Sequence, residues 1–377
     1  MKKLISLILI VSFLFCVFAA SSFAQEEIQT QAKSLILIEA ETGRVLYELN
    51  ADEALPPASV TKIMTLLLVM EALDDGKFAL DDMVPVSSRA AAMGGSQVYL
   101  EPGEQLSVEE MLKCVVIASA NDAAAALAEF VCGSLESFVT KMNERAAQLG
   151  MEHTHFENTN GLDDTTSEHL TSARDIAIMS SELLKHAKIL DYTGIWMDSI
   201  RDGAFGLTNT NRLIRFYKGA NGLKTGSTAK AGFCISATAK RDGMQLIAVV
   251  MGSPTRDERN QTAAKLLDYG FANYEVYSYD GAQLSLPVKG GKEESARLSA
   301  DAQLFVLNKG EGKKVNINLE LPEYLSAPLP ARTVVGHAQL TLDGKELGNI
   351  EIKLDNEVER VGFWDLFERL FSSFTLF

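Results

Sequence analysis

The first residues of the chain form one long apolar segment behind a basic start. Met1-Lys2-Lys3 precedes an almost unbroken apolar run from Leu4 to Phe18, and small residues follow at Ser22 and Ala24. This order is the layout of a secretory signal peptide. The run is shorter than the ~20 apolar residues of a membrane-spanning helix. We therefore predict that residues 1–24 are an export signal.

Between residues 34 and 274, short apolar strands lie at both ends and segments with helical periodicity lie between them. The spacing of apolar residues predicts strands at 34–39, 45–49, 232–238 and 245–251, and helices at 59–73, 108–118, 121–131, 172–190 and 257–274. This order indicates an α/β sheet covered by helices, with a helical insertion.

The pattern changes near residue 277, where the helical periodicity stops. Residues 315–321 alternate strictly between apolar and polar side chains, as a half-buried strand does. Two further apolar segments, 339–342 and 350–354, flank Asp343-Gly344, a dipeptide typical of hairpin turns. We predict a small all-β, sandwich-like domain over residues 277–356.

The end of the chain carries an aromatic stripe. Within residues 361–377 the large apolar side chains recur at helical spacing on one face: Phe363, Trp364, Leu366, Phe367, Leu370, Phe371 and Phe374. The segment is too short and too polar to span a bilayer, but it suits a helix lying in the membrane interface. The alternative is a helix packed on its own protein. We favour a membrane-associating helix over residues 357–377, bound by hydrophobic burial because the segment is nearly neutral.

Composition and charge narrow the class of protein. The 377 residues are 47% hydrophobic and 23% charged, as in an ordinary folded chain. A net charge of −15 has the wrong sign for a general nucleic-acid binder, whose affinity comes from neutralising phosphates. No cysteines have CxxC spacing, and His153 and His155 lack further ligands nearby. We expect no nucleic acid, no metal and no cofactor, and no disulfide framework among Cys16, Cys114, Cys132 and Cys234.

Ser59 and Lys62 form the first candidate catalytic motif, S-x-x-K, at the start of the helix expected over 59–73. The spacing puts Lys62 one turn along the same helix face as Ser59. Serine is a poor nucleophile until a base takes its proton, and a lysine can be that base when burial and a second cation lower its pKa. Backbone N–H groups at the helix start can also stabilise an oxyanion. On its own, the motif is better explained by a helix-capping serine and a solvent-exposed lysine.

Two more short motifs follow. Ser119-Ala120-Asn121 lies at the break between two expected helices, where a hydroxyl and a carboxamide can relay a proton and hold a substrate amide. Lys224-Thr225-Gly226 lies just before the strand expected at 232–238. On an edge strand this lysine can lower the pKa of a neighbouring lysine, the threonine can bond a carboxylate, and the glycine admits a ligand close to the backbone. Taken alone, the Ser119 motif is explained equally by N-capping at Asn121. The Lys224 motif, taken alone, is explained equally by an ordinary turn.

In this order the three motifs are those of class A β-lactamases and penicillin-binding proteins. The chain resembles the serine-type D-alanyl-D-alanine carboxypeptidases, the low-molecular-mass penicillin-binding proteins, over residues 34–274 and on through the β domain and the terminal helix. Further segments carry the resemblance: 58–65, 94–96, 101–103, 118–123, 160–162, 172–175 and 211–213. Among relatives the chain is most similar to those of Gram-positive spore formers.

The resemblance implies a catalytic domain over residues 25–276, an antiparallel sheet covered by helices. Its substrate would be the peptidoglycan pentapeptide stem that ends in D-Ala-D-Ala. Ser59 would attack the carbonyl of the penultimate D-Ala, with Lys62 as the general base. Ser119 would pass a proton to the leaving amine, Asn121 would position the peptide, and Lys224 would tune the electrostatics. Water would then release the acyl group.

The resemblance also implies the binding groups. The backbone N–H groups of Ser59 and Ser227 would form the oxyanion hole beside Gly226. Thr225 and Arg259 would bind the terminal carboxylate of the substrate. Penicillins would acylate the same serine. The enzyme would be exported and attached to the outer face of the cytoplasmic membrane through residues 361–377.

Three alternatives stay open at this point. A class A-like β-lactamase needs an added glutamate for fast deacylation, and Glu157, near Asn160, lies close to the expected region but outside the usual pattern. A non-catalytic penicillin-binding wall sensor would lack a catalytic group, whereas all of them are present. A transpeptidase would differ only in the acceptor that resolves the acyl-enzyme.

Overall fold

The computed structural model describes residues 28–164, 166–281 and 284–374. The export signal expected at residues 1–24 lies outside the described residues, as do residues 375–377 at the end of the terminal segment. The described chain contains an α/β part, residues 28–273, a β part that begins at residue 274, and a final helix.

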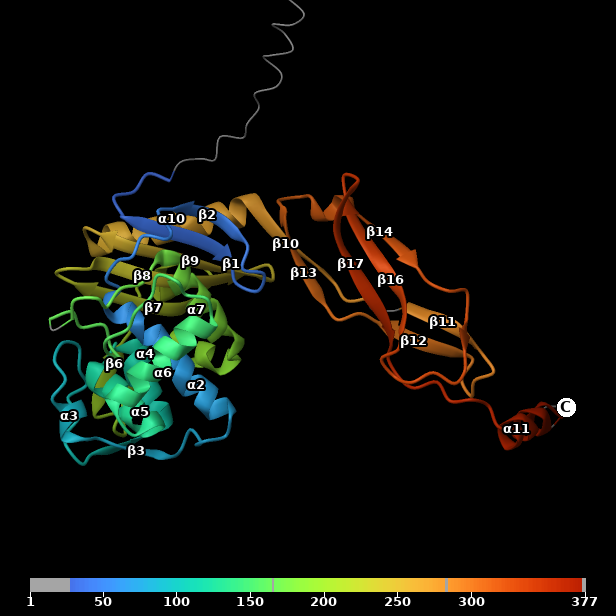
Figure 1. The fold of residues 1–377 in the computed structure, drawn as a ribbon, viewed down its shortest axis with the longest axis horizontal. Helices are drawn as coiled ribbons and strands as arrows, with labels where there is room; N and C mark the ends of the chain where they lie inside the picture. The colour runs from blue at the N-terminus through green and yellow to red at the C-terminus, as the bar shows by residue number, and fades with distance from the viewer. Residues whose placement is uncertain (1–27, 165, 282–283, 375–377) are drawn as a thin grey trace, which may run out of the picture. The chain divides into compact units, whose positions relative to one another are not determined.

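A five-stranded antiparallel sheet is the centre of the α/β part (Figure 1). Its strand order is β2-β1-β9-β8-β7, with β1 Ser34–Glu39, β2 Val45–Leu49, β7 Ala220–Thr228, β8 Gly232–Arg241 and β9 Met244–Ser253. Helices cover both faces of this sheet, so β1 is buried at all six positions and reads as one apolar run. Lys224 lies on β7, a strand that the sequence did not predict, and β7 is at the sheet edge that the proposed role of this lysine requires.

The helices occupy both sides of the sheet. Helix α10 packs on β8 and β9, and α7 packs on β1 and β9 from the other side, next to α2 (Figure 1). The helical elements are η1 Ala58–Thr61, α2 Lys62–Asp74, α3 Ser88–Ala91, α4 Val108–Ile117, α5 Asn121–Cys132, α6 Leu135–Gln148, α7 Ala173–Lys185, η2 Ala187–Ile189, α8 Leu190–Thr193, α9 Leu213–Phe216 and α10 Arg256–Asn273. The α/β fold expected from the sequence is confirmed.

Two expected helices differ from those observed. The helix expected over 172–190 ends at Lys185, because His186 leaves the helical region with ψ at 79° before η2 and α8 begin. The helix expected over 59–73 begins as the 3-10 turn η1, and regular α2 starts only at Lys62. Two small two-stranded sheets were not expected: β3 Met83–Pro85 with β4 Gln105–Ser107, and β5 Met197–Ile200 with β6 Phe205–Thr208.

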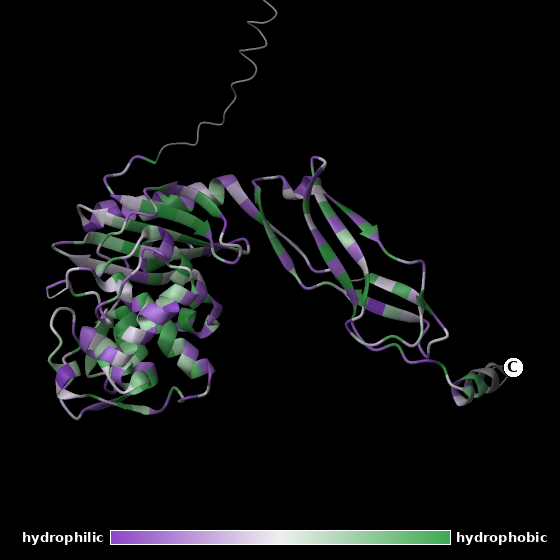
Figure 2. Ribbon diagram, in the orientation of Figure 1, coloured by the Kyte–Doolittle hydropathy of each residue, from purple (hydrophilic) through white to green (hydrophobic). Residues whose placement is uncertain are grey.

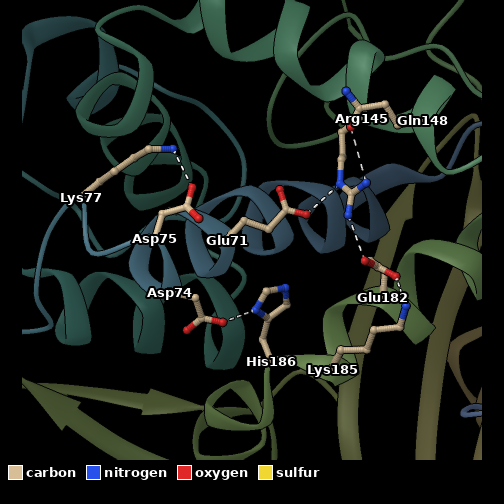
Figure 3. Close-up of polar contacts among 9 residues, drawn as sticks. All are labelled: Glu71, Asp74, Asp75, Lys77, Arg145, Gln148, Glu182, Lys185 and His186. Atoms are coloured by element: carbon tan, nitrogen blue, oxygen red, sulfur yellow. Dashed lines mark hydrogen bonds and ion pairs between the residues drawn. The ribbon is translucent and has the colours of Figure 1, made fainter.

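Arg145 joins three helices through half-buried ion pairs (Figure 3). From α6, its Nε donates to Glu71 Oε1 on α2 at 2.7 Å, and its Nη2 donates to Glu182 Oε1 on α7 at 2.9 Å. The side chains of the three residues are only 19–25% exposed. Lys77 and Asp75 form a more exposed pair nearby, with side chains 51% and 63% exposed. Arg145 therefore fixes the far end of α2, the helix whose first residue is Lys62.

The β part consists of two sheets that share a core. A six-stranded sheet has the order β14-β16-β17-β12-β11-β15, and β10 pairs with β13. Tyr277, Tyr279 and Phe305 from the pair pack against the buried core cluster that includes Ala338 and Leu340 of the larger sheet. The elements are β10 Tyr274–Tyr279, β11 Leu284–Lys289, β12 Ser295–Ser299, β13 Gln303–Asn308, η3 Gly312–Lys314, β14 Val315–Glu320, β15 Leu325–Ser326, β16 Val334–Leu342 and β17 Lys345–Leu354.

The hairpin expected around Asp343-Gly344 is present between β16 and β17. Both strands alternate between hydrophobic and hydrophilic residues, as Figure 2 shows. The expected all-β fold of this part is confirmed, and its first strand begins at Tyr274.

The last described element is α11, Phe363–Phe374. At the beginning of the aromatic stripe, Phe363 and Trp364 are 75% and 73% exposed, and Leu366 and Phe367 are 48% and 49% exposed. Among the described residues no single helix is both long and apolar enough to cross a membrane. Within the part of the chain that the structure describes, α5 and α6 pass that test when taken together, and these two helices are bent by 84° at their junction.

Candidate active site

Ser59 lies in a tight turn at the start of α2. The preceding residue, Ala58, is buried and left-handed, with φ at +50°, a conformation that costs an alanine about 1–2 kcal/mol. Thr61 Oγ1 donates to the Ala58 carbonyl at 2.9 Å. Gly161 packs directly on this carbonyl, because a Cβ added to it would lie 1.8 Å from Ala58 O. The turn is thus fixed from two sides, while Ser59 itself stays half-exposed.

Lys62 is fully buried beneath Ser59. Its Nζ lies 2.9 Å from Ser59 Oγ and 2.9 Å from the backbone oxygen of Asn160, and it also contacts Asn121 Oδ1. These partners are one hydroxyl and two amide oxygens, none of them charged. Neither Ser59 nor Lys62 fits the alternative explanation of the motif, because the caps of η1 and α2 are Pro57 and Thr61 and the lysine is not in solvent.

Ser119 and Asn121 enter the same site from the break between α4 and α5. Ser119 is left-handed, with φ at +62°, which ends α4 and directs the chain into α5. Asn121 is the first residue of α5 and does not cap it. Its Oδ1 accepts from Lys62, and its Nδ2 donates to Gly94 O at 2.7 Å. The capping explanation of Asn121 is therefore wrong.

A buried carboxylate beside this break holds the loop on which Ser96 lies. Asp122 accepts from the backbone N–H groups of Val98 and Leu100, each at 3.1 Å. The Asn121 N–H donates to Ser96 O at 2.7 Å. The start of α5 therefore fixes both the amide that contacts Lys62 and the neighbouring loop.

Lys224 closes the site from strand β7. Its Nζ donates to Ser119 Oγ at 2.8 Å and to Thr225 O at 3.0 Å, and its side chain is buried. Gly226 lies against the Ser59 turn, because a Cβ added to it would lie 2.7 Å from Ser59 N and 2.8 Å from Pro57 O. Only glycine lets the edge strand approach the turn this closely.

Both lysines have lowered pKa values. Burial holds the pKa of Lys62 well below its usual range, and the positive charge of Lys224 lowers it further. Burial also lowers the pKa of Lys224 to about 7, with a smaller contribution from the positive charge of Arg259. A lysine of this kind is available as a base near neutral pH.

Ser59 opens into a small polar pocket on this face. Its walls include hydroxyl groups and two arginines, and the lining residues are Ser59, Ser96, Ser119, Thr210, Thr225, Gly226, Ser227, Arg256 and Arg259. Thr225 Oγ1 donates to Thr210 Oγ1 at 2.7 Å. Arg259 is buried, and its guanidinium donates to Asn260 Oδ1 at 2.8 and 3.1 Å and to Cys234 O at 3.4 Å. The cationic wall suits an anionic end of a substrate.

The structure brings all nine expected site residues to one place. Ser59, Ser119, Thr225, Gly226, Ser227 and Arg259 line the pocket, and Lys62, Asn121 and Lys224 lie directly behind it. Sequence reasoning did not assign Ser96, Thr210, Arg256, Asn160 or His169 to the site. Ser96 and Asn160 lie in segments that carry the family resemblance, which is the one signal that points to them. Thr210 and His169 approach only through folding of distant loops.

Glu157 does not serve as the glutamate that a class A-like β-lactamase would need. Its carboxylate accepts from the backbone N–H groups of Ser167 and Glu168 at 3.0 and 3.1 Å. No carboxylate is present among the described residues that line the pocket around Ser59.

Ser59 is hydrogen-bonded to buried Lys62, and a second hydrogen-bonded pair, Ser119 with Lys224 of the edge strand, lies beside it. This arrangement is typical of a serine acyl-transfer enzyme. The family model described as D-alanyl-D-alanine carboxypeptidase matches residues 20–255, and the penicillin-binding protein 5 C-terminal domain matches residues 271–360. The chain belongs to the D-alanyl-D-alanine carboxypeptidase family and is a serine peptidase of the penicillin-binding class.

Individual relatives are similar to this chain over nearly its whole length. The D-alanyl-D-alanine carboxypeptidase DacF of Bacillus subtilis is 43% identical, over 100% of both chains. DacC of Escherichia coli is 36% identical over 94% of this chain and 92% of its own. The crystal structure of penicillin binding protein 5 from Haemophilus influenzae superposes with a TM-score of 0.71 at 32% identity, over 88% of this chain and 98% of that one.

Proposed function

We propose that this chain removes the terminal D-Ala from peptidoglycan pentapeptide stems through an acyl-enzyme on Ser59. The observation that carries the proposal is the 2.9 Å contact between Ser59 Oγ and Lys62 Nζ, in which the lysine is buried and has no charged partner. A carboxypeptidase of this family needs such a base to activate its serine.

The hydrogen bonds around Lys62 suit a neutral amine. A neutral lysine has two N–H donors and one lone pair, and the oxygens of Asn121 and Asn160 can only accept. They take the two donors, and the lone pair remains for the Ser59 hydroxyl. In acylation, Lys62 takes the Ser59 proton while Oγ forms a bond to the carbonyl carbon of the penultimate D-Ala.

The tetrahedral intermediate and the leaving group have their own partners. The backbone N–H groups of Ser59 and Ser227 bind the oxyanion, and the close approach at Gly226 supports this pairing. When the C–N bond breaks, Ser119 passes its proton to the nitrogen of the departing D-Ala. Ser119 then receives the proton that Lys62 took from Ser59, so that Lys62 is neutral again for the water step. Lys224, bonded to Ser119 Oγ at 2.8 Å, keeps that hydroxyl oriented.

The cationic wall of the pocket binds the substrate carboxylate. Thr225 and Arg259 receive the C-terminal carboxylate, and Arg256 adds a second positive charge. Burial lowers the pKa of Arg259 to about 10, so the guanidinium stays charged at neutral pH. Arg259 then exchanges its contacts with Asn260 for the substrate. Asn121 positions the peptide, and water resolves the acyl-enzyme, which restores the Ser59 hydroxyl.

Penicillins acylate the same serine in this proposal. A solved relative, penicillin-binding protein D2 from Listeria monocytogenes in the ampicillin bound form, is 32% identical over 65% of this chain and 99% of its own, with a TM-score of 0.60. A β-lactam presents a strained amide in place of the D-Ala-D-Ala bond, so Ser59 would form a stable penicilloyl ester.

The chain acts outside the cytoplasm in this proposal. Residues 1–24 direct export, 25–276 form the catalytic domain, 277–356 the β domain and 357–377 the membrane-associating helix. The support is the exposed aromatic start of α11, with Phe363 and Trp364 75% and 73% exposed. An exposed apolar helix face suits the membrane interface.

The first test is mass spectrometry of a D-Ala-D-Ala-terminated stem peptide after incubation with the purified protein. We expect the wild type to remove one alanine and Ser59→Ala to leave the peptide intact. Equal cleavage by both proteins would contradict the assignment of the nucleophile. A wild type that joins the peptide to an added amine, rather than to water, would favour the transpeptidase alternative.

A further inference from the structure

His169 is a buried histidine that the proposed mechanism does not use. It is 4% exposed and comes from the loop before α7, distant in sequence from the Ser59 turn. Its Nδ1 accepts from the Glu157 N–H at 3.0 Å, and its Nε2 lies 2.8 Å from Thr61 Oγ1. Both ring nitrogens are thus committed to partners that lie next to the site.

The direction of these hydrogen bonds follows from their donors. A backbone N–H can only donate, so His169 Nδ1 is unprotonated and the ring proton is on Nε2. The Thr61 hydroxyl donates to Ala58 O at 2.9 Å, so its oxygen is free to accept from Nε2–H. The result is a one-way chain of hydrogen bonds from Glu157 through His169 and Thr61 to Ala58, which we call the His169 chain.

The His169 chain ends on the residue before the nucleophile. Ala58 holds a left-handed conformation that an alanine disfavours, so its carbonyl needs a fixed partner to keep this orientation. The chain begins on the segment that contains Asn160, whose backbone oxygen contacts Lys62. The buried His169 ring therefore connects the segment that contacts Lys62 to the turn that carries Ser59.

We propose that His169 is a positioning residue for acylation, which acts through Thr61 to hold the Ala58–Ser59 turn in its reactive geometry. This inference rests on the proposed function of Ser59. The neutral ring it requires agrees with its surroundings, because burial lowers the pKa of His169 to about 4, against the opposing charges of Glu157 and Asp163.

The test removes one hydrogen bond at a time from the full-length protein. Thr61→Val keeps the side-chain shape but lacks the hydroxyl, whereas Thr61→Ser keeps the hydroxyl. His169→Gln can place a donor near the Nε2 position, whereas His169→Asn can only replace Nδ1. Thr65→Val is the matched control, because Thr65 Oγ1 donates to Thr159 O at 2.6 Å from the next turn of the same helix, without touching the His169 chain.

The readouts are kcat and KM for the D-Ala-D-Ala peptide, the acylation rate with a fluorescent penicillin, and the melting temperature. We expect Thr61→Val and His169→Asn to lower kcat and the acylation rate by roughly 10- to 100-fold, as a small displacement of a reacting group does, with KM nearly unchanged. Thr61→Ser and His169→Gln should recover most of this loss. Thr65→Val should lower the melting temperature with a much smaller effect on kcat.

Two results would overturn the inference. One is a folded Thr61→Val or His169→Asn protein that is acylated at the wild-type rate. The other is an equal loss of kcat in Thr65→Val, which would mean general loosening of the helix. If Thr61→Val fails to fold, the comparison of His169→Asn with His169→Gln decides in the same way. A wild type that neither cleaves nor becomes acylated contradicts the proposed function itself, which separates the two failures.

Discussion

We expect Lys62 to act as a base, because its hydrogen-bond partners are neutral and its side chain is buried. A carboxylate at the same distance would hold the amine in its charged form, whereas amide oxygens and a hydroxyl accept either form. The second lysine adds to this effect without touching the first. The site thus obtains a basic lysine by burial and charge repulsion together.

The charge of Lys224 gives a prediction about pH. Acylation needs neutral Lys62, so its rate rises with pH through the pKa of Lys62. Because the Lys224 charge lowers that pKa, Lys224→Gln should move the rising limb of the pH profile to higher pH. The position of the limb is the readout, measured with a fluorescent penicillin, since the lost contact with Ser119 also lowers the maximum rate.

Lys224→Arg is the control for this experiment. It retains a positive charge at every pH used, so its rising limb should remain at the wild-type position or below it. If the limb of Lys224→Gln coincides with that of wild type, the charge of Lys224 does not set the pKa of Lys62.

The sequence predicts the proposed catalytic residues better than it predicts the residues that hold them in place. Ser59, Lys62, Ser119 and Lys224 occur in short motifs whose order is specific, so their convergence is expected. Thr210 and His169 lie in no such motif, and each approaches the site through loop packing between residues distant in sequence. Hydrophobic periodicity contains no information about such contacts.

Among the elements, α2 matters most because it begins at Lys62. Its first turns contact the 157–162 segment, and its far end is tied to α6 and α7 through Arg145 (Figure 3). The sequence predicts this helix from apolar spacing. It does not predict the 3-10 turn at its start, because the left-handed Ala58 that prevents regular helix depends on Gly161 from another segment.

The Arg145 ion pairs give a prediction about stability. Arg145→Met should lower the free energy of unfolding by about 1–3 kcal/mol, between the values for exposed and buried pairs, since it leaves Glu71 and Glu182 without their partner. Lys77→Met, which breaks only the exposed pair with Asp75, should lower it by less than about 1 kcal/mol.

Denaturant unfolding measures both variants, and kcat measured beside it reports on the site. Because Arg145 lies at the far end of α2, kcat of Arg145→Met should stay near that of wild type while the variant is folded. Equal stability of the two variants would mean that the ion pairs on Arg145 do not fix α2.

At the scale of the whole molecule, the chain joins a peptidase fold to a β part and an exposed amphipathic helix. The alternation along β16 and β17 predicts their hairpin, since both strands are neighbours in sequence. The pairing of β10 with β13 is not predicted, because it joins strands separated by two others. Sequence patterns thus predict the pairing of strands that are neighbours in sequence. The pairing of more distant strands depends on how the segments pack.

The helix α11 gives a prediction about membranes. Trp364→Ala in the full-length protein should weaken binding to lipid vesicles by roughly 10- to 100-fold, since burying a large apolar side chain contributes about 1.5–3 kcal/mol. Binding should change little with salt, because Asp365 and Glu368 offer no attraction to anionic lipids.

Vesicle sedimentation measures this, with Met197→Ala as the control. Met197 is 63% exposed on β5 and has no part in α11, so its loss should leave binding unchanged. Binding that disappears in moderate salt would contradict attachment by hydrophobic burial.

The central claim is that Ser59 is the nucleophile and that buried Lys62 activates it. The most direct measurement is the intact mass of wild type, Ser59→Ala and Lys62→Ala after brief exposure to benzylpenicillin, followed by mapping of the modified peptide. We expect one penicilloyl group on Ser59 of wild type that persists for minutes or longer, none on Ser59→Ala, and strongly slowed formation on Lys62→Ala. An adduct on another residue, or equally fast acylation of Lys62→Ala, would contradict the account.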